Sequence, residues 1–314
     1  MKYIIEIENL TKIYPNKFTA LSELTFKVPK GVFGFLGPNG AGKTTLMEIL
    51  VGLMKPTVGT ASILGHNIME ESIESRRHIG YLPEKPGVYE DMSGFRFLRY
   101  MGELSGLAPS KASKNAKETL KFVGLNEWGE KLAGSYSAGM RQRLALAQAL
   151  IADPEVIFLD EPTANLDPLG RDDVIKKVKE LAARGKTIFI SSHIIPEIEQ
   201  MADHIAIIHE GKLVVEGSVR DLIRRQDLNE YKIEVSEPEI VKRELETRDF
   251  VSNIRLVQNR IFVKTADSEM LSSEIPKILA AHNMRLRSFE PIKTDLETIF
   301  RDALKNPHGG LKNE

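Results

Sequence analysis

The chain of 314 residues contains no cysteine. This absence excludes a disulfide framework, a thiolate zinc site, a cysteine-ligated iron–sulfur cluster and a cysteine nucleophile. No uninterrupted apolar run approaches the ~20 residues that a membrane-crossing helix needs. The start of the chain carries acids where a signal peptide requires an apolar segment. We therefore expect the protein to be made and kept in the cytosol, and to reach any membrane through a partner.

An excess of either charge is also missing, because 43 lysines and arginines face 44 acidic residues and the net charge is −1. A nucleic-acid partner is therefore not expected, and neither is an acidic solvating tail. With 42% hydrophobic residues, a chain of this length can bury a large core without disulfides or metals. The length predicts two domains, or one large domain with an appendage.

A glycine-rich segment follows the short apolar run at 32–36 and matches the pattern G-x-x-x-x-G-K-[ST]. Its residues are Gly37, Pro38, Asn39, Gly40, Ala41, Gly42, Lys43 and Thr44. In this pattern backbone N–H groups point at phosphate oxygens, and the N-terminal end of the following helix adds positive charge. Lys43 would reach the β- and γ-phosphates, and the Thr44 hydroxyl would bind Mg²⁺. We also count Thr45 among the nucleotide-binding residues.

A phosphate loop alone does not distinguish an ATPase from a GTPase, a kinase or a motor protein. The Asn-Lys-x-Asp sequence with which GTPases read the guanine base does not occur in this chain. The GTPase interpretation is therefore disfavoured, while the other classes stay open at this point.

Two acidic residues end a second apolar run, Val156–Leu159. Acids at the carboxyl end of a buried strand lie where doubly wound sheets bind ligands. Asp160 would belong to the Mg²⁺ shell, and Glu161 would polarise a water for in-line attack. Alternatively, the two acids only cap the following turn, but the complete phosphate loop disfavours this. His193, after another apolar run, could contact a γ-phosphate or merely bond a backbone carbonyl.

The order of these segments predicts an α/β fold of the P-loop NTPase type, with a mostly parallel sheet and helices. We expect an antiparallel β subdomain near the start and a helical subdomain inserted at about 88–152. The nucleotide-binding domain would cover 1–219, and a small α+β accessory domain would cover 220–314. The accessory domain has the order βαββαβ plus a helix, which is compatible with a ferredoxin-like fold. Its last residues, 306–314, are expected to form a frayed tail.

The segment ahead of Asp160 carries the most specific motif. Its residues are Tyr136, Ser137, Ala138, Gly139, Met140, Arg141, Gln142 and Arg143. They resemble the signature Leu-Ser-Gly-Gly-Gln, followed by Gln-Arg, of the nucleotide-binding subunits of ABC transporters. The chain departs from that signature at its first, third and fifth positions. Ser137 is also a good helix N-cap, which does not conflict with the resemblance. The resemblance covers about residues 1–220.

This resemblance implies a head-to-tail dimer that holds two ATP molecules between its subunits. Ser137 and Gly139 would contact the γ-phosphate that is bound by the other subunit. The resemblance also implies that Tyr14 stacks on adenine, that Asp167 belongs to a loop coupling the two sites, and that His193 is a switch histidine. Tyr14 could instead be only an aromatic at a strand edge. Whether the partner is a second copy or a related subunit stays open.

Glu84 departs from the family pattern, which usually has glutamine at this position. The family's glutamine contacts Mg²⁺ and the attacking water, and its loop docks onto the membrane subunit. A carboxylate could bind Mg²⁺ more tightly or disfavour the γ-phosphate. By the same resemblance, integral-membrane permease subunits would dock near Glu84–Ser93.

Taken together, these features predict an ATP-binding and ATP-hydrolysing subunit of an ABC-type transporter. It would act at the cytoplasmic face of a membrane, attached through separately encoded permease subunits. The segment Thr294–Phe300 resembles an element that ends the ATPase subunits of some exporters, which favours export. The accessory domain could regulate, stabilise the dimer, or only extend the structure. The rival is a soluble ABC-type ATPase of translation or DNA repair, but two cassettes, sustained heptads and zinc cysteines are missing from this sequence.

Overall fold

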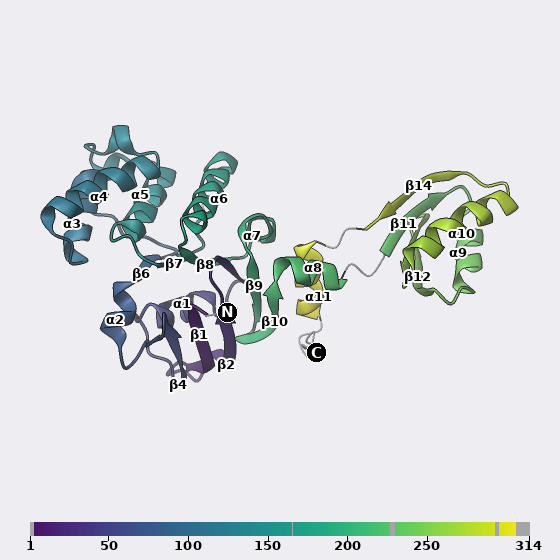
Figure 1. Cartoon of the computed structure of the whole chain (residues 1–314), viewed down its shortest axis with the longest axis horizontal. Coiled ribbons are helices and arrows are strands. Elements are labelled where there is room, and N and C mark those ends of the chain that lie inside the picture. Colours follow the sequence, from purple (N-terminus) through teal and green to yellow (C-terminus); the bar gives the residue numbers. More distant parts are fainter. Residues whose placement is uncertain (1–2, 165, 227–229, 293–294, 306–314) are drawn as a thin grey trace. The chain divides into compact units, whose positions relative to one another are not determined.

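The computed structural model describes residues 3–164, 166–226, 230–292 and 295–305. The tail expected at 306–314 and Thr294 of the exporter-like segment lie outside these described residues. The chain divides into two compact units, residues 1–219 with 300–314, and residues 220–299 (Figure 1). Within the described residues, no helix combines the length and the apolar character that crossing a membrane requires.

The first unit is built on a six-stranded sheet. Its strands, in order across the sheet, are β10 (Lys212–Ser218), β9 (His204–His209), β3 (Val32–Leu36), β8 (Thr187–Ser192), β7 (Val156–Asp160) and β6 (Ile79–Leu82). All neighbours are parallel except the β9–β10 pair. Every residue of β3, β7 and β8 is buried, which explains why these strands are continuous apolar runs.

A second, antiparallel sheet packs onto the first. Its strands are β2 (Thr19–Val28), β1 (Ile5–Ile13), β4 (Val58–Ile63) and β5 (His66–Asn67). Helix α1 (Lys43–Leu50) joins both sheets in one hydrophobic cluster, in which the ring of Phe26 stacks on that of Phe33 at 5.7 Å. The expected antiparallel β subdomain is therefore present. Helix α1 ends at Leu50, and Gly52 follows it with φ +78°.

Three helices, coloured blue to teal in Figure 1, form the subdomain that the sequence predicts at 88–152. They are α3 (Gly94–Leu104), α4 (Pro109–Phe122) and α5 (Ala138–Leu150). The other helices of this unit are α2 (Ser72–Arg77), α6 (Pro168–Ala183) and α7 (Ile195–Met201). Asp167 caps helix α6, with its Oδ1 accepting a hydrogen bond from the Gly170 N–H at 2.9 Å.

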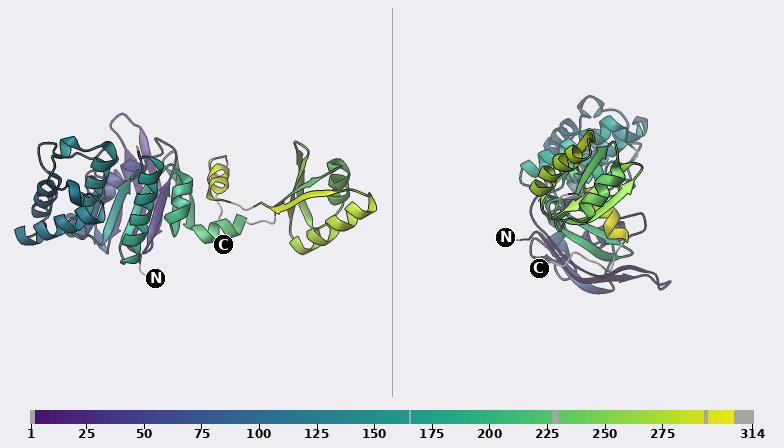
Figure 2. Two further views of the ribbon diagram at one scale, coloured as in Figure 1. Left: turned by 90° about the horizontal axis from the view of Figure 1, so that it is seen from above. Right: turned by 90° about the vertical axis from the view of Figure 1, so that its right-hand side faces the viewer.

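The second unit contains a four-stranded antiparallel sheet. Its order is β12 (Val251–Val257), β13 (Arg260–Thr265), β11 (Glu230–Val235) and β14 (Leu286–Pro291). Helices α9 (Pro238–Glu246) and α10 (Ser268–Ala281) cover one face of this sheet through a shared apolar cluster (Figure 2). This order is that of a βαββαβ ferredoxin-like fold.

Turn chemistry fixes the central hairpin of the second unit. Gln258 and Asn259 both have positive φ, +46° and +66°, as a two-residue type I′ turn requires. These two residues therefore close the hairpin between β12 and β13. Two further helices complete the described chain, α8 (Val219–Gln226) and α11 (Leu296–Lys305). The predicted α/β fold class, with an additional α+β part, is confirmed.

Candidate active site

The phosphate loop connects β3 to α1, and the helix begins at Lys43. Its amino end therefore opens directly onto the loop, where partial positive charge gathers. Gly42 has φ +107°, and a Cβ at this position would approach the carbonyl oxygen of Ala20 to 2.5 Å. Only glycine fits here, because both the backbone conformation and the available space exclude a side chain.

The Lys43 side chain is buried and fully engaged. Its Nζ donates to the carbonyl oxygens of Gly37 at 2.8 Å and Pro38 at 3.3 Å. The same Nζ lies 3.4 Å from Oε1 of Glu161. A buried ammonium requires such compensation, and the phosphate loop and the end of β7 supply it together.

Asp160 ends β7 and is fully buried. Its Oδ1 accepts a hydrogen bond from the Ser191 hydroxyl, whereas its buried Oδ2 has no hydrogen-bond partner. Burial raises the pKa of Asp160, and the charges of Glu161 and Glu84 add to this, while the hydroxyl groups of Ser191 and Thr44 oppose it. A carboxylate oxygen that is buried and unpartnered suits a hard cation such as Mg²⁺. Thr44 and Asp160 therefore fit a magnesium ion.

The backbone turns sharply at Glu161, which has φ +47°, an uncommon value for a residue with a side chain. Its N–H donates to the Ser191 Oγ at 3.1 Å, and this bond holds the turn. The carboxylate lies between Lys43 and His193, whose Nδ1 is 2.8 Å from Oε2 of Glu161. Unusual backbone conformations of this kind concentrate at functional sites.

These groups surround a pocket of about 530 Å³. The predicted site residues that line it are Tyr14, Asn39, Gly40, Gly42, Lys43, Thr44, Thr45, Glu84, Glu161 and His193. The remaining loop residues Gly37, Pro38 and Ala41 do not line this pocket, and neither does Asp160, which is buried behind it. The structure therefore brings together, in one pocket, residues from five places in the chain that the sequence analysis identified only by motif or resemblance.

Two lining residues, Phe18 and Ala20, were not predicted, whereas Ala164 belongs to the loop that the resemblance implies at Asp167. The Phe18 ring stacks near that of Tyr14, with centroids 6.4 Å apart, and the Tyr14 hydroxyl lies 3.3 Å from that of Thr45. Phe18 is 54% exposed, although it is a large apolar residue. An aromatic in a polar turn close to Tyr14 was the signal that could have identified it.

Ser137, Gly139 and Asp167 lie elsewhere, around a second pocket of about 530 Å³. Ser137 caps α5, and its Oγ accepts the Met140 N–H at 3.2 Å. Asp167 and its neighbour Leu166 line the same pocket, while Asn165 lies outside the described residues. Within one chain, these residues and the phosphate loop therefore form two separate pockets.

Tyr136 stands where the family signature has leucine, and it is almost completely buried. Its hydroxyl donates to the Trp128 carbonyl oxygen at 2.6 Å. Burial raises the pKa of Tyr136, so the phenol stays protonated and remains a donor. A Cβ on Gly94 would lie 2.4 Å from this hydroxyl, so Gly94 provides the space for the larger ring.

Glu84 is exposed and lines the first pocket. Across the described chain, no three histidine, aspartate or glutamate side chains gather into a metal site. A magnesium ion at Thr44 and Asp160 would therefore depend on the phosphates of a nucleotide for its remaining ligands.

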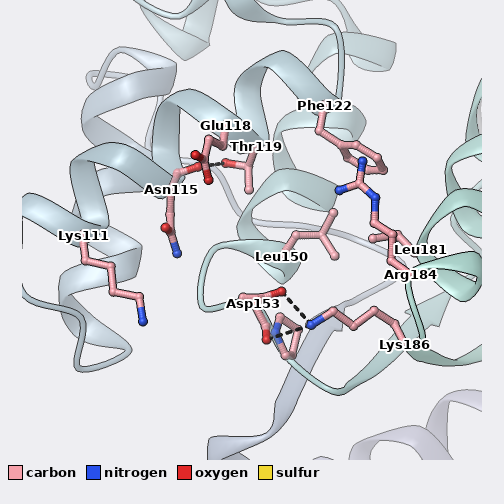
Figure 3. A pocket seen from close by; sticks show the side chains of 11 residues that line it. Lys111, Asn115, Glu118, Thr119, Phe122, Leu150, Asp153, Leu181, Arg184 and Lys186 are labelled. Atoms are coloured by element: carbon pink, nitrogen blue, oxygen red, sulfur yellow. Dashed lines mark hydrogen bonds and ion pairs between the residues drawn. The ribbon is translucent and has the colours of Figure 1, made fainter.

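A third pocket, of about 250 Å³, lies between α4 and the ends of α5 and α6 (Figure 3). The positive and negative charges of its lining residues nearly cancel, and Lys186 forms an ion pair with Asp153 at 2.6 Å. The Arg184 guanidinium lies 5.1 Å from the centre of the Phe122 ring. None of the predicted site residues lines this pocket.

Comparison with known proteins identifies the family. A family model described as "ABC transporter" matches residues 21–164. The bacitracin transport ATP-binding protein BcrA of Enterococcus faecalis is 35% identical over 303 residues, 96% of this chain and 96% of that protein. The daunorubicin resistance ATP-binding protein DrrA3 of Streptomyces coeruleorubidus is 39% identical over 219 residues, 69% of each chain.

A solved ATP-binding subunit of an ABC transporter has the same fold, with a TM-score of 0.64 at 29% identity. The match covers 71% of this chain and 92% of that chain. The predicted family, fold and ATPase activity are thereby confirmed. The chain belongs to the ABC transporter ATP-binding proteins and is an ATP-binding, ATP-hydrolysing subunit of such a transporter.

Proposed function

We propose that this subunit powers export across a membrane, hydrolysing ATP at the pocket that contains Lys43 and Glu161. The observation that carries the assignment of the hydrolysis site is the placement of the Glu161 carboxylate, which lies between a buried ammonium and the His193 imidazole at the wall of that pocket. Such a carboxylate can accept a proton from a water that attacks a γ-phosphate.

ATP would bind with its adenine against Tyr14 and its phosphates along residues 37–45. Phosphate oxygens would replace the Glu161 carboxylate as the partner of Lys43, because they carry more negative charge. Glu161 would then be free to orient and deprotonate the attacking water, and His193 would hold that carboxylate in place. Each of these exchanges uses a contact that the chain already makes.

Mg²⁺, when bound, would neutralise charge on the β- and γ-phosphates. Thr44 and Asp160 are the residues that would hold it, with Glu84 close enough to influence the charge of Asp160. The carboxylate of Glu84 would replace the amide that is usual in the family. Because carboxylates bind hard cations more strongly than amides do, it would strengthen the metal site.

The functional form would be a head-to-tail dimer. The pocket at Ser137 is separate from the pocket at the phosphate loop, and the two have the same volume of about 530 Å³. In such a dimer, Ser137 and Gly139 of one subunit would close the ATP site of the other. The second subunit could be a copy of this chain or a related one.

Permease subunits would dock near Glu84–Ser93, at the cytoplasmic face of the membrane. Tyr89 in this segment is 55% exposed, as expected for a contact surface that awaits a partner. Export is favoured by two relatives whose names describe bacitracin transport and daunorubicin resistance. We propose residues 1–219 as the ATPase domain and residues 220–314 as an accessory domain.

The test is the substitution Glu161→Gln in the otherwise unchanged protein. Hydrolysis should fall by about 10²–10⁴-fold, the contribution of a positioned general base. ATP binding should persist, since Lys43, Thr44 and Asp160 still hold the phosphates and metal. Light scattering should show an ATP-dependent dimer near twice 35.2 kDa, unless the protein is already dimeric without ATP.

The double variant with Ser137→Arg is the control for the dimer, because the added bulk and charge should prevent closure. Normal hydrolysis by Glu161→Gln would show that Glu161 is not the base. An inactive variant without any ATP-dependent change in assembly or compactness would contradict the proposed dimer.

A further inference from the structure

A short segment of the first unit belongs to both large pockets. Glu161 and Ala164 line the pocket at the phosphate loop. Leu166 and Asp167, a few residues further along, line the pocket at the signature residues. A displacement of this segment must therefore change the shape of both pockets.

The middle of this segment is held from behind by a buried carboxylate that has no place in the mechanism above. Glu197 on α7 is only 6% exposed, and the Thr163 hydroxyl donates to its Oε2 at 2.5 Å. Thr163 itself is 1% exposed. A glutamate is seldom buried in this way unless it is paired, so the contact is specific.

The same carboxylate also reaches the far end of the segment. Its Oε1 lies 3.6 Å from Nη1 of Arg171, in the early part of α6. Arg171 in turn donates from Nε to the Leu166 carbonyl oxygen at 3.1 Å. Glu197 therefore connects Thr163, near the first pocket, with Leu166, at the second.

Two further contacts tie this bridge to the elements that carry the reacting groups. Glu197 lies four residues after His193 in the sequence, and the His193 side chain contacts Glu161. On the other side, the Gln142 side chain in α5 donates to the Pro162 carbonyl oxygen at 3.1 Å. Helix α5 begins at the Ser137 cap. The segment is therefore hydrogen-bonded to α7, which follows His193, and to α5, which begins at Ser137.

We propose that the Thr163–Glu197–Arg171 bridge, whose threonine and glutamate are buried, couples the two ATP sites of the dimer. This rests on the proposed function, because only in a head-to-tail dimer do the two pockets of one chain serve different ATP molecules. When ATP in one site changes the position of Glu161 and His193, the bridge carries that shift to Leu166 and Asp167 at the other site. Glu197 is a positioning residue that touches neither nucleotide.

The test is the ATP dependence of hydrolysis by the full chain. Thr163→Val removes the hydroxyl and keeps nearly the same volume, whereas Thr163→Ser keeps the hydroxyl. The wild-type protein should give a Hill coefficient clearly above 1. Thr163→Val should bring it close to 1 and lower kcat about tenfold, because the buried Glu197 carboxylate then loses its hydrogen bond to the segment and keeps only the ion pair with Arg171. Thr163→Ser should restore the Hill coefficient.

Binding of a fluorescent ADP analogue to the same proteins separates coupling from damage to the site. Its dissociation constant should stay unchanged, because the bridge does not touch the phosphate loop. The matched control is Thr265→Val in the second unit, where the buried hydroxyl donates to the Phe250 carbonyl oxygen at 2.9 Å. This control should retain the wild-type Hill coefficient.

Three results would overturn the inference, and they are distinguishable. A wild-type protein that does not hydrolyse ATP would overturn the proposed function and the bridge with it. A wild-type Hill coefficient of 1 would leave the ATPase intact but remove the coupling. Wild-type cooperativity in Thr163→Val, or an equal loss in Thr163→Ser, would remove only the bridge.

Discussion

The sheets of the two units place their charges differently. All residues of β7 and β8 are buried, and apart from Thr187 at the start of β8 their polar side chains lie where the strands end, at Asp160, Ser191 and Ser192. Strand β11 of the second unit instead alternates near its end, and Lys232 and Glu234 lie on its less buried face. A sheet that is covered on both faces concentrates its polar groups at one edge, where they can act together on a ligand.

Each unit contains a lysine–glutamate pair, and the two pairs show the consequence. Lys43 and Glu161 are 3.4 Å apart with side chains only 7% and 8% exposed. Lys232 and Glu234 are 3.1 Å apart, and both side chains are 26% exposed. Water screens the second pair more strongly, so its charges matter less. The exposure of a charged group to water, and not the presence of a partner, therefore decides how strongly its charge acts on neighbouring groups.

The largest expected difference concerns these two lysines. Lys43→Ala should lower ATP hydrolysis by at least about 100-fold, because a charge facing the phosphates is lost. Nucleotide binding should weaken, while the far-ultraviolet circular dichroism stays that of a folded protein. Lys232→Ala is the matched control and should leave turnover unchanged. Turnover of Lys43→Ala at half the wild-type value or more would contradict the assignment of the phosphate loop.

The next largest effect compares aromatic residues in the two sheets. Phe189 in β8 is fully buried and packs against Phe33, Phe35 and Phe158. Phe189→Ala should cost about 3–5 kcal/mol in the free energy of unfolding. Phe262→Ala, on the half-exposed face of β13, should cost clearly less. Urea unfolding followed by circular dichroism measures both free-energy losses. Equal losses would mean that Phe189 and Phe262 are equally well packed.

The same contrast explains which strands could be predicted. Val32–Leu36 was predicted with its observed bounds and Val156–Leu159 to within one residue, because each is a compact apolar run. Residues 58–82 were not assigned, although they form β4, β5, α2 and β6. Strand β4 has only Ala61 and Ile63 buried, and its pairing with β1 forms it. Local propensity is weak where partners distant in sequence decide the structure.

The candidate site was predictable to a similar extent. Local motifs identify the phosphate loop and the two acids, since each depends on neighbouring residues. Phe18 and Glu197 carry no motif, and only tertiary contacts bring them to the site or behind it. Their importance could not be derived from spacing along the chain.

A smaller effect is expected at Glu84, which differs from the family pattern. Glu84→Gln should keep turnover within about tenfold, because the amide that is usual in the family still fits. The concentrations of Mg²⁺ and Mn²⁺ needed for half-maximal turnover should rise, since an amide binds these cations more weakly. Titration of both metals measures this. Identical titrations of variant and wild type would show that Glu84 does not approach the metal.

The smallest effect is expected on the open face of the second sheet. The Lys232 and Arg260 side chains lower the pKa of Glu234 below its ordinary 4.5, with the hydrogen bond from Lys232 the largest cause. A lowered pKa means that the ionised form stabilises the fold above pH 4.5, and this stabilisation is lost as the pH falls through the folded-state value. Glu234→Gln should therefore lower the melting temperature at pH 7 by less than about 2 °C, because the pair is solvent-exposed. The difference between variant and wild type should disappear in more acidic buffer, and ATP hydrolysis should not change. A large or pH-independent difference would show that this face, like the end of β7, carries charges shielded from water.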